Sequence, residues 1–192
     1  MSELSKQECG ALFLDRDGVL NELVVRDGRR VSPRRLADFV ITAGASEGLR
    51  TIEQRGFGRF VVTNQPDIAR GAMAPNELKA MHSRLHEVLP LTDIAFCPHD
   101  DGFNCQCRKP KPGLILALAS KWNISLQKSV IIGDTSRDIE AGRAAGCRTI
   151  LLNERVAKLG EDIWAARLSE ALDAALGLLV RLNKPSGATG RE

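Results

Sequence analysis

The chain has 192 residues, of which 43% are hydrophobic and 27% charged, a composition typical of globular proteins rather than disordered or fibrous ones. The net charge of +3 is too small to favour a nucleic-acid-binding protein, and no stretch approaches the roughly 20 consecutive apolar residues of a membrane span. Because residues 1–10 are mostly polar, we expect no secretory leader. We therefore expect one domain over residues 1–182, a cytoplasmic location, and neither a membrane nor a nucleic-acid partner.

Short apolar runs alternate with amphipathic segments along the chain, and this pattern predicts strands alternating with helices. In chain order we expect a strand at Ala11–Leu14, a hairpin at Val19–Val31, a helix at Ala45–Arg55, a strand at Arg59–Val62, a helix at Pro75–Leu89, a strand at Asp93–Phe96, a helix at Pro112–Trp122, a strand at Val130–Ile132, a helix at Ser136–Ala145, a strand at Arg148–Leu152 and a long helix at Asp162–Leu182. Strands separated by such helices are typical of an α/β fold, so we expect a Rossmann-like parallel sheet with helices on both faces.

The hairpin and the last ten residues lie outside this alternation. Asp27-Gly28 is a pair typical of a two-residue hairpin turn. Arginines surround the hairpin, namely Arg26, Arg29, Arg30, Arg34 and Arg35. They form either a basic flap over a second phosphate of the substrate or a solvated surface. Residues 183–192 are rich in Gly, Pro and Ser, and we expect a disordered tail there.

Four polar motifs follow predicted strands or open a predicted helix. They are Asp15-Arg16-Asp17-Gly18, Thr63-Asn64, Arg108-Lys109-Pro110 and Gly133-Asp134 with Asp138. Each motif alone is ordinary turn, loop or helix-cap chemistry. In a parallel sheet, however, ligands bind outside the carboxyl ends of the strands, so motifs at those ends converge on one edge. Their joint occurrence predicts a single site.

The acidic residues of these motifs predict a magnesium site and a nucleophile. Asp15 and Asp17 are two apart, so in an extended segment their carboxylates point to the same side and repel unless a cation lies between them. With Asp134 they make an oxygen set suited to Mg²⁺. Asp15, first off the strand, is the predicted nucleophile that forms an aspartyl-phosphate. Asp17 is the predicted acid that protonates the leaving alcohol and the base that later deprotonates water.

The other motif residues predict a phosphate-binding set. Lys109 would offset the charge on the phosphoryl oxygens, while Thr63 and Asn64 would donate hydrogen bonds to them. Asp138 has three interpretations: it touches the metal, it orients Lys109, or it favours the N-terminus of its own helix.

A cluster of thiols and one imidazole predicts a structural zinc site. Its members are Cys97, His99, Cys105 and Cys107. Three thiolates and an imidazole suit tetrahedral zinc and leave no open position for catalysis. The alternative is a chance cluster of reduced thiols. Such a cluster favours a reducing compartment, and a bound zinc would make the Arg-Lys pair after Cys107 face the phosphate.

Taken together, these motifs resemble the haloacid dehalogenase superfamily of aspartate-nucleophile phosphatases, from about Ala11 to Leu152. The resemblance implies Mg²⁺ dependence, and the lack of a long insertion between motifs implies a member without a cap domain. The cysteine loop running into Arg108-Lys109 is similar to the branch of heptose-bisphosphate and histidinol-phosphate phosphatases. It implies an enzyme that uses Arg108 to recognise a small phosphorylated sugar and removes the 7-phosphate of a heptose 1,7-bisphosphate. We expect this enzyme to be a monomer.

Three features keep other substrates open. Pro66-Asp67 replaces the Ser-Gly usual in heptose enzymes, Thr135 stands where many carry a lysine, and the cysteine loop is short, as in the histidinol-phosphate branch. One alternative is therefore a phosphatase of histidinol phosphate, of another small phosphometabolite or of polynucleotide ends. The other is a zinc-bearing nucleic-acid-binding module without catalysis.

Overall fold

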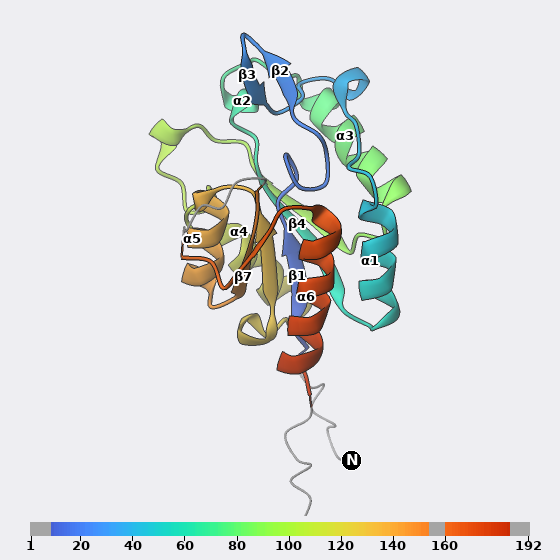
Figure 1. Cartoon of the computed structure of the whole chain (residues 1–192). Helices are drawn as coiled ribbons and strands as arrows, with labels where there is room; N and C mark the ends of the chain where they lie inside the picture. Colours follow the sequence, from blue (N-terminus) through green and yellow to red (C-terminus); the bar gives the residue numbers. More distant parts are fainter. Residues whose placement is uncertain (1–8, 154–159, 185–192) are drawn as a thin grey trace, which may run out of the picture.

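A parallel sheet lies at the centre of the molecule (Figure 1). The computed structural model describes residues 9–153 and 160–184, and over these residues the sheet has six strands in the order β5-β4-β1-β6-β7-β8. The strands are β1 (Ala11–Leu14), β4 (Gly58–Asn64), β5 (Asp93–Cys97), β6 (Val130–Gly133), β7 (Arg148–Leu152) and β8 (Ile163–Ala165). Every pairing in this sheet is parallel, which confirms the expected α/β fold.

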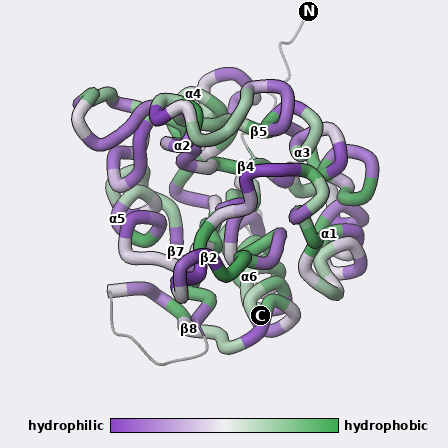
Figure 2. Tube along the Cα trace, turned by 90° about the horizontal axis from the view of Figure 1, so that it is seen from above, coloured by the Kyte–Doolittle hydropathy of each residue, from purple (hydrophilic) through white to green (hydrophobic). Residues whose placement is uncertain are grey.

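Helices cover both faces of the sheet, as expected. The helices are α1 (Ala45–Gln54), α2 (Pro66–Ala69), α3 (Pro75–Val88), α4 (Gly113–Trp122), α5 (Ser136–Ala145) and α6 (Leu168–Leu182), with 3₁₀ turns at Leu36–Asp38, Asp101–Phe103 and Leu126–Lys128. Seen from above, α1 and α3 lie on one side and α5 on the other, with β4 and β7 between them (Figure 2). Among the described residues, no helix is long and apolar enough to cross a membrane.

The central strand β1 has apolar side chains on both of its faces, so a layer of helices is needed to bury each face. Side chains alternate along a strand, so Leu12 and Leu14 enter the core shared with α1, α3 and α6, whereas Phe13 enters the core shared with α4 and α5. All residues of β1 are buried, which gives the continuous apolar run typical of a strand covered on both faces.

The carboxyl ends of three adjacent strands meet at one edge of the sheet. Leu14, the last residue of β1, is in register with Val61 of β4 and Ile132 of β6. The residues that follow these positions therefore emerge side by side. β1 pairs with β4 on one side and with β6 on the other. Ligands of open parallel sheets bind outside the carboxyl ends of the strands at such a position.

The hairpin is shorter than predicted. Its strands are β2 (Val24–Arg26) and β3 (Arg29–Val31), and it stands beyond the carboxyl ends of the sheet strands (Figure 1). The turn is the expected one, because Asp27 and Gly28 both have positive φ, 50° and 72°. Val19 and Leu20 do not join the hairpin, since both are completely buried in the core.

The predicted helix at Asp162–Leu182 is wrong over its first residues, which form the edge strand β8. The Asp162 carboxylate accepts the backbone N–H of Thr149 at 2.7 Å, and this contact draws the following residues into pairing with β7. The helix α6 begins only after Arg167. The Glu170 carboxylate, in the first turn, accepts the backbone N–H of Arg167 and so caps the helix.

The first residue of the expected tail, Asn183, is bound to the rest of the fold. Asn183 ends α6, and its side-chain amide accepts the N–H of Gly10 at 2.7 Å and donates to the carbonyl of Lys128 at 3.0 Å. This amide therefore joins the last helix to the start of β1. Residues 185–192 lie outside the described part of the chain.

Candidate active site

Three carboxylates converge at the edge where β1 and β6 end. Asp15, Asp134 and Asp138 each place one oxygen within 4.8 Å of the others. Asp15 is held at the end of β1 because its N–H donates to the carbonyl of Ile132 on β6 at 2.9 Å. Asp134 follows β6 directly, and Asp138 lies in the first turn of α5.

This acidic group has the properties of a divalent-cation site. Burial, with the nearby charges of Asp15 and Asp138, raises the pKa of Asp134 to about 8, and burial raises the pKa of Asp15 to about 7. Asp134 Oδ1 is buried without a hydrogen-bond partner among the described residues. A Cβ at Gly18 would meet Asp134 Oδ2 at 2.3 Å, so only glycine leaves this carboxylate its place. A hard cation with oxygen ligands fits this donor set.

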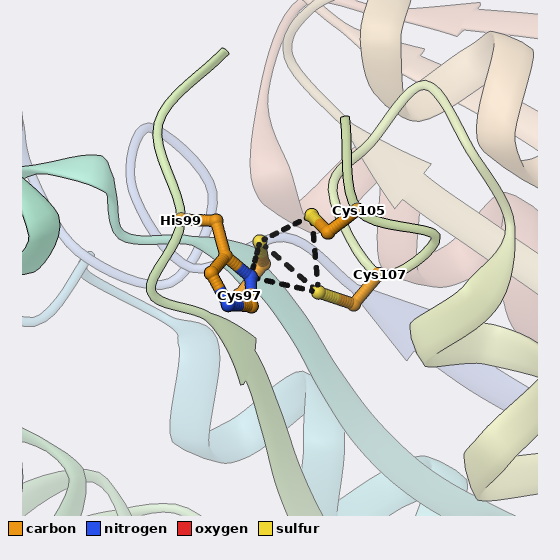
Figure 3. A group of neighbouring side chains, drawn as sticks. All are labelled: Cys97, His99, Cys105 and Cys107. Atoms are coloured by element: carbon orange, nitrogen blue, oxygen red, sulfur yellow. Dashed lines mark hydrogen bonds between the residues drawn. The ribbon is translucent and has the colours of Figure 1, made fainter. Parts of the chain in front are cut away.

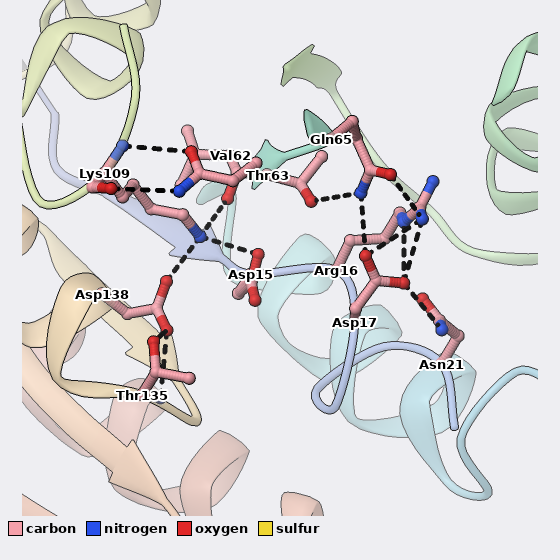
Figure 4. A network of polar contacts seen from close by, with 11 residues as sticks. Asp15, Arg16, Asp17, Asn21, Val62, Thr63, Gln65, Lys109, Thr135 and Asp138 are labelled. Carbon is pink, nitrogen blue, oxygen red and sulfur yellow. Dashed lines mark hydrogen bonds and ion pairs between the residues drawn. The ribbon is translucent and has the colours of Figure 1, made fainter. Parts of the chain in front are cut away.

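The Asp17 carboxylate is not part of that group, contrary to the arrangement expected from its spacing to Asp15. Asp17 Oδ1 accepts hydrogen bonds from Arg16 and Asn21, both at 3.0 Å, and Oδ2 accepts from Gln65 at 2.8 Å (Figure 4). The chain turns directly after Asp15, so the two side chains do not follow the alternation of an extended strand.

Lys109 is the cation of the site. Its ammonium group donates to Asp15 Oδ1 at 2.7 Å, to Asp138, and to the carbonyl of Val62 at 2.8 Å (Figure 4). Burial alone would lower the pKa of Lys109, but the charges of Asp138 and Asp15 outweigh it and raise that pKa. The lysine is therefore a fixed positive charge beside the predicted nucleophile.

Thr63 and Asn64, both predicted to bind phosphate, differ in their hydrogen bonds. The Asn64 side chain binds the main chain of Lys109, donating to its carbonyl and accepting its N–H, both at 3.0 Å. Thr63 Oγ1 accepts from Gln65 at 2.9 Å, and a hydroxyl that accepts on one side can donate on the other. Both residues line the cavity beside Asp15, and Asn64 also positions the main chain of the lysine.

Asp138 makes the contacts expected from two of its three interpretations, namely orienting Lys109 and capping its own helix. One oxygen binds Lys109, and the other accepts from the N–H of Thr135 at 3.1 Å and from its hydroxyl at 2.6 Å. The second set is the capping box that begins α5. Thr135, noted above as standing where many related enzymes carry a lysine, therefore holds Asp138 in place.

A second side-chain cluster lies on the loop after β5 (Figure 3). Its sulfur–sulfur distances are 3.6 Å for Cys97–Cys105 and 3.3 Å for both Cys97–Cys107 and Cys105–Cys107, and His99 Nδ1 lies 3.3 Å from the Cys107 sulfur. A tetrahedron around zinc, with Zn–S near 2.3 Å, has edges of about 3.8 Å. The four donors fit zinc after small outward movements.

The cysteine loop also holds Arg108. The Arg108 guanidinium donates to the Asp101 carboxylate at 2.7 Å and to the carbonyl of His99 at 3.2 Å. Arg108 lines the cavity beside Asp15, together with Arg30 from the hairpin. That cavity has a volume of about 280 Å³. The loop therefore presents one of the three arginines that line this cavity, the third being Arg137.

Sequence reasoning missed the roles of Arg16, Gln65 and His82, of which Arg16 contacts the other two. Arg16 is completely buried and binds Asp17, Gln65 and His82. A signal for Arg16 was available, since it follows an apolar strand directly and stands between two acids that could bind its charge. His82 gave no comparable signal, because it lies on a remote helix.

Comparison with known proteins identifies the family. The chain is 35% identical over 148 residues to D-glycero-beta-D-manno-heptose-1,7-bisphosphate 7-phosphatase of Rhodopseudomonas palustris, and the match covers 71% of this chain and 79% of that one. The chain belongs to the haloacid dehalogenase-like hydrolases. The protein of the same name from Helicobacter pylori is 38% identical over 148 residues, covering 74% of this chain and 82% of that one.

Two further matches agree with the hydrolase family. The profile of the HAD-hydrolase-like family, where HAD stands for haloacid dehalogenase, matches residues 106–167. The crystal structure of D,D-heptose 1,7-bisphosphate phosphatase from B. bronchiseptica, complexed with magnesium and phosphate, superposes with a TM-score of 0.75 at 25% identity. That match covers 88% of this chain and 98% of the other. The resemblance to haloacid dehalogenase phosphatases inferred from the motifs is therefore confirmed.

Proposed function

We propose that this haloacid dehalogenase-like hydrolase is a Mg²⁺-dependent phosphatase that removes the 7-phosphate of a heptose 1,7-bisphosphate through an aspartyl-phosphate on Asp15. The names of its relatives support the substrate. The observation that carries the chemistry is the Lys109 ammonium, which binds both Asp15 and Asp138. It lies beside Asp134, whose Oδ1 has no hydrogen-bond partner within the described part of the chain.

In the first step the Asp15 carboxylate attacks phosphorus, and the bond from phosphorus to the sugar oxygen breaks. Asp17 gives its proton to that oxygen, so the sugar leaves as an alcohol. In the second step Asp17 takes a proton from water, which attacks the aspartyl-phosphate and releases phosphate. Lys109 offsets negative charge throughout, and Thr63 donates a hydrogen bond to a phosphoryl oxygen. Asp15 and Asp134 would hold Mg²⁺, which supplies further positive charge to the phosphoryl oxygens.

The cysteine loop has a structural role in this proposal. Zinc held by the four donors after β5 would fix the loop that presents Arg108, with no step of the reaction on the zinc itself. A thiol cluster of this kind needs a reducing compartment, and for this reason we place the enzyme in the cytoplasm. We expect it to act as a monomer.

The space around Asp15 suits a substrate with two phosphates. The cavity of about 280 Å³ that contains Asp15 shares Leu23, Arg30 and Asp134 with a neighbouring cavity of about 460 Å³. A sugar that places one phosphate at Asp15 would extend its other end past Arg30. The guanidinium of Arg30 would then bind the second phosphate, the role weighed for the basic flap.

A phosphate-release assay tests the proposal. Heptose 1,7-bisphosphate, histidinol phosphate and a phosphate-ended oligonucleotide are each incubated with the enzyme, with and without Mg²⁺. We expect Mg²⁺-dependent release from the first and much slower release from the others, and no release by Asp15→Asn. Preference for histidinol phosphate would replace the proposed substrate. Steep salt-dependent binding of the oligonucleotide without release from any of the three would support the nucleic-acid-binding alternative.

A further inference from the structure

An arginine with no contact to solvent lies behind Asp17. Arg16 has zero exposure and is the largest completely buried side chain of the described residues. Its Nε and Nη2 donate to the Asp17 carboxylate at 3.0 to 3.1 Å, and Nη2 also donates to Gln65 Oε1 at 3.1 Å. The guanidinium carbon lies 5.5 Å from the centre of the Phe39 ring. Arg16 is on the side of Asp17 that faces away from Asp15 (Figure 4).

The remaining nitrogen of this guanidinium has its partner on a different element. Nη1 of Arg16 lies 3.3 Å from Nε2 of His82, on α3. Burial, followed by the charge of Arg16, lowers the pKa of His82 to about 4. The imidazole is therefore neutral near pH 7, and its Nε2 can accept the hydrogen bond of Arg16. The ring edge packs on Phe96, with ring centres 5.5 Å apart.

His82 thus completes the partners of a buried charge. A guanidinium has a rigid planar set of donors, so its orientation is determined by all the groups that it binds. Asp17 and Gln65 bind one end of the Arg16 guanidinium, and His82 binds the other. His82 itself lies outside the catalytic cavity, in a surface groove whose other side is formed by Ile68, Phe96 and Pro98.

We propose that His82 is a positioning residue for the proton transfers of the phosphatase, because it orients Arg16, which in turn orients the Asp17 carboxylate. The inference rests on the proposed function, in which Asp17 is the acid and base. Proton transfer requires the donor and acceptor atoms to approach within hydrogen-bond distance, and small misplacements of a catalytic group slow it strongly. Loss of the acceptor at His82 leaves a buried N–H of Arg16 without a partner, and the guanidinium then turns and moves Asp17.

The nature of the leaving group separates this role from a general structural one. A primary alcohol must be protonated as it leaves, whereas p-nitrophenolate and acetate leave without a proton. For a reaction through a covalent intermediate, kcat/KM reports the steps up to the loss of the leaving group. A variant that misplaces the acid therefore loses kcat/KM on a sugar phosphate and keeps it on p-nitrophenyl phosphate and acetyl phosphate.

The experiment compares His82→Leu, His82→Gln and His86→Leu. Leu removes the acceptor, and Gln retains an acceptor oxygen of similar reach. His86 lies one turn along α3 in the same surface groove and serves as the matched control. Each folded variant, checked by its thermal unfolding, is assayed on the sugar bisphosphate and on the two activated phosphates.

We expect His82→Leu to lower kcat/KM about tenfold on the sugar phosphate, the effect of one hydrogen bond to a charged group, with little change on the activated phosphates. We expect His82→Gln and His86→Leu to behave as the unmodified enzyme. An equal loss on all substrates, or no loss on any, overturns the inference about His82. Failure of the proposed function is a different result, because the unmodified enzyme would then release no phosphate, or Asp15→Asn would retain the activity.

Discussion

The Lys109 ammonium lies 2.7 Å from the Asp15 carboxylate, although the two residues are 94 positions apart in the chain. The contact exists because β1 ends beside β4, whose Asn64 binds the main chain of Lys109 through two hydrogen bonds. The predicted nucleophile and its cation are therefore held together by the register of two neighbouring strands. Five predictions concern this pair and the groups around the site.

Replacing Lys109 with Gln removes the fixed positive charge next to the nucleophile. We expect kcat on the sugar bisphosphate to fall by roughly 100-fold or more, because a preorganised charge acts on the charge that develops at phosphorus. Steady-state kinetics measure the loss. Lys111→Gln is the matched control, since the Lys111 ammonium binds the exposed Asn104 instead. An unchanged kcat in Lys109→Gln would remove the lysine from the catalytic step.

The metal-free protein should lose stability as the pH rises. The pKa of Asp134 is raised in the folded state from 3.8 to about 8, so folding favours the protonated acid. This contribution is complete below the unfolded pKa and disappears as the pH approaches about 8. Thermal unfolding in a chelator of divalent ions should therefore show a melting temperature that falls between pH 5 and pH 8.

Mg²⁺ and the substitution Asp134→Asn should both reduce that pH dependence. A bound cation stabilises the ionised carboxylates, and the stabilisation grows with the ratio of free Mg²⁺ to its dissociation constant. Asn carries no charge to repel Asp15 and Asp138. Asp134→Asn should accordingly melt no lower than the unmodified protein without metal and gain less from Mg²⁺. A larger gain from Mg²⁺ in Asp134→Asn would place the metal elsewhere.

Removing zinc should weaken both the fold around the loop and catalysis. We expect Cys107→Ser to lose the bound zinc, to unfold at a lower temperature and to have reduced kcat/KM, because Arg108 follows this residue directly and is held by the same loop. Metal analysis, thermal unfolding and the phosphate-release assay give the three readouts. The control is Cys147→Ala, a buried cysteine away from the cluster. Retained zinc in Cys107→Ser would show that the four donors do not form the site.

Arg30 should distinguish a bisphosphate from a monophosphate. It lines both cavities at the site, whereas its hairpin neighbour Arg29 lines neither. Replacing Arg30 with Ala should raise KM for the sugar bisphosphate about fivefold, since an exposed charge pair contributes about 1 kcal/mol, and should leave KM for a sugar monophosphate unchanged. Equal effects of Arg29→Ala and Arg30→Ala would indicate a general effect of positive charge instead.

Much of the fold could be predicted because it depends on local patterns. The helix at Ser136–Ala145 has the bounds expected from its apolar spacing and its capping residues. The turn at Asp27-Gly28 follows from the backbone geometry that a short hairpin requires. The start of Asp162–Leu182 was predicted wrongly because pairing with β7, a contact outside the segment itself, draws its first residues into a strand.

The chemistry available at the site could be inferred from the residue pattern, since the acids, the lysine and the cysteine cluster are each placed by the strand or loop that they follow. Which of these groups meet depends on how the elements pack. The tertiary structure turned Asp17 away from the acidic group toward Arg16, and it brought His82 from α3 to complete the partners of that arginine. The physical reason is that a buried charge is oriented by every neighbour that can bind it, and those neighbours come from elements that only packing brings together.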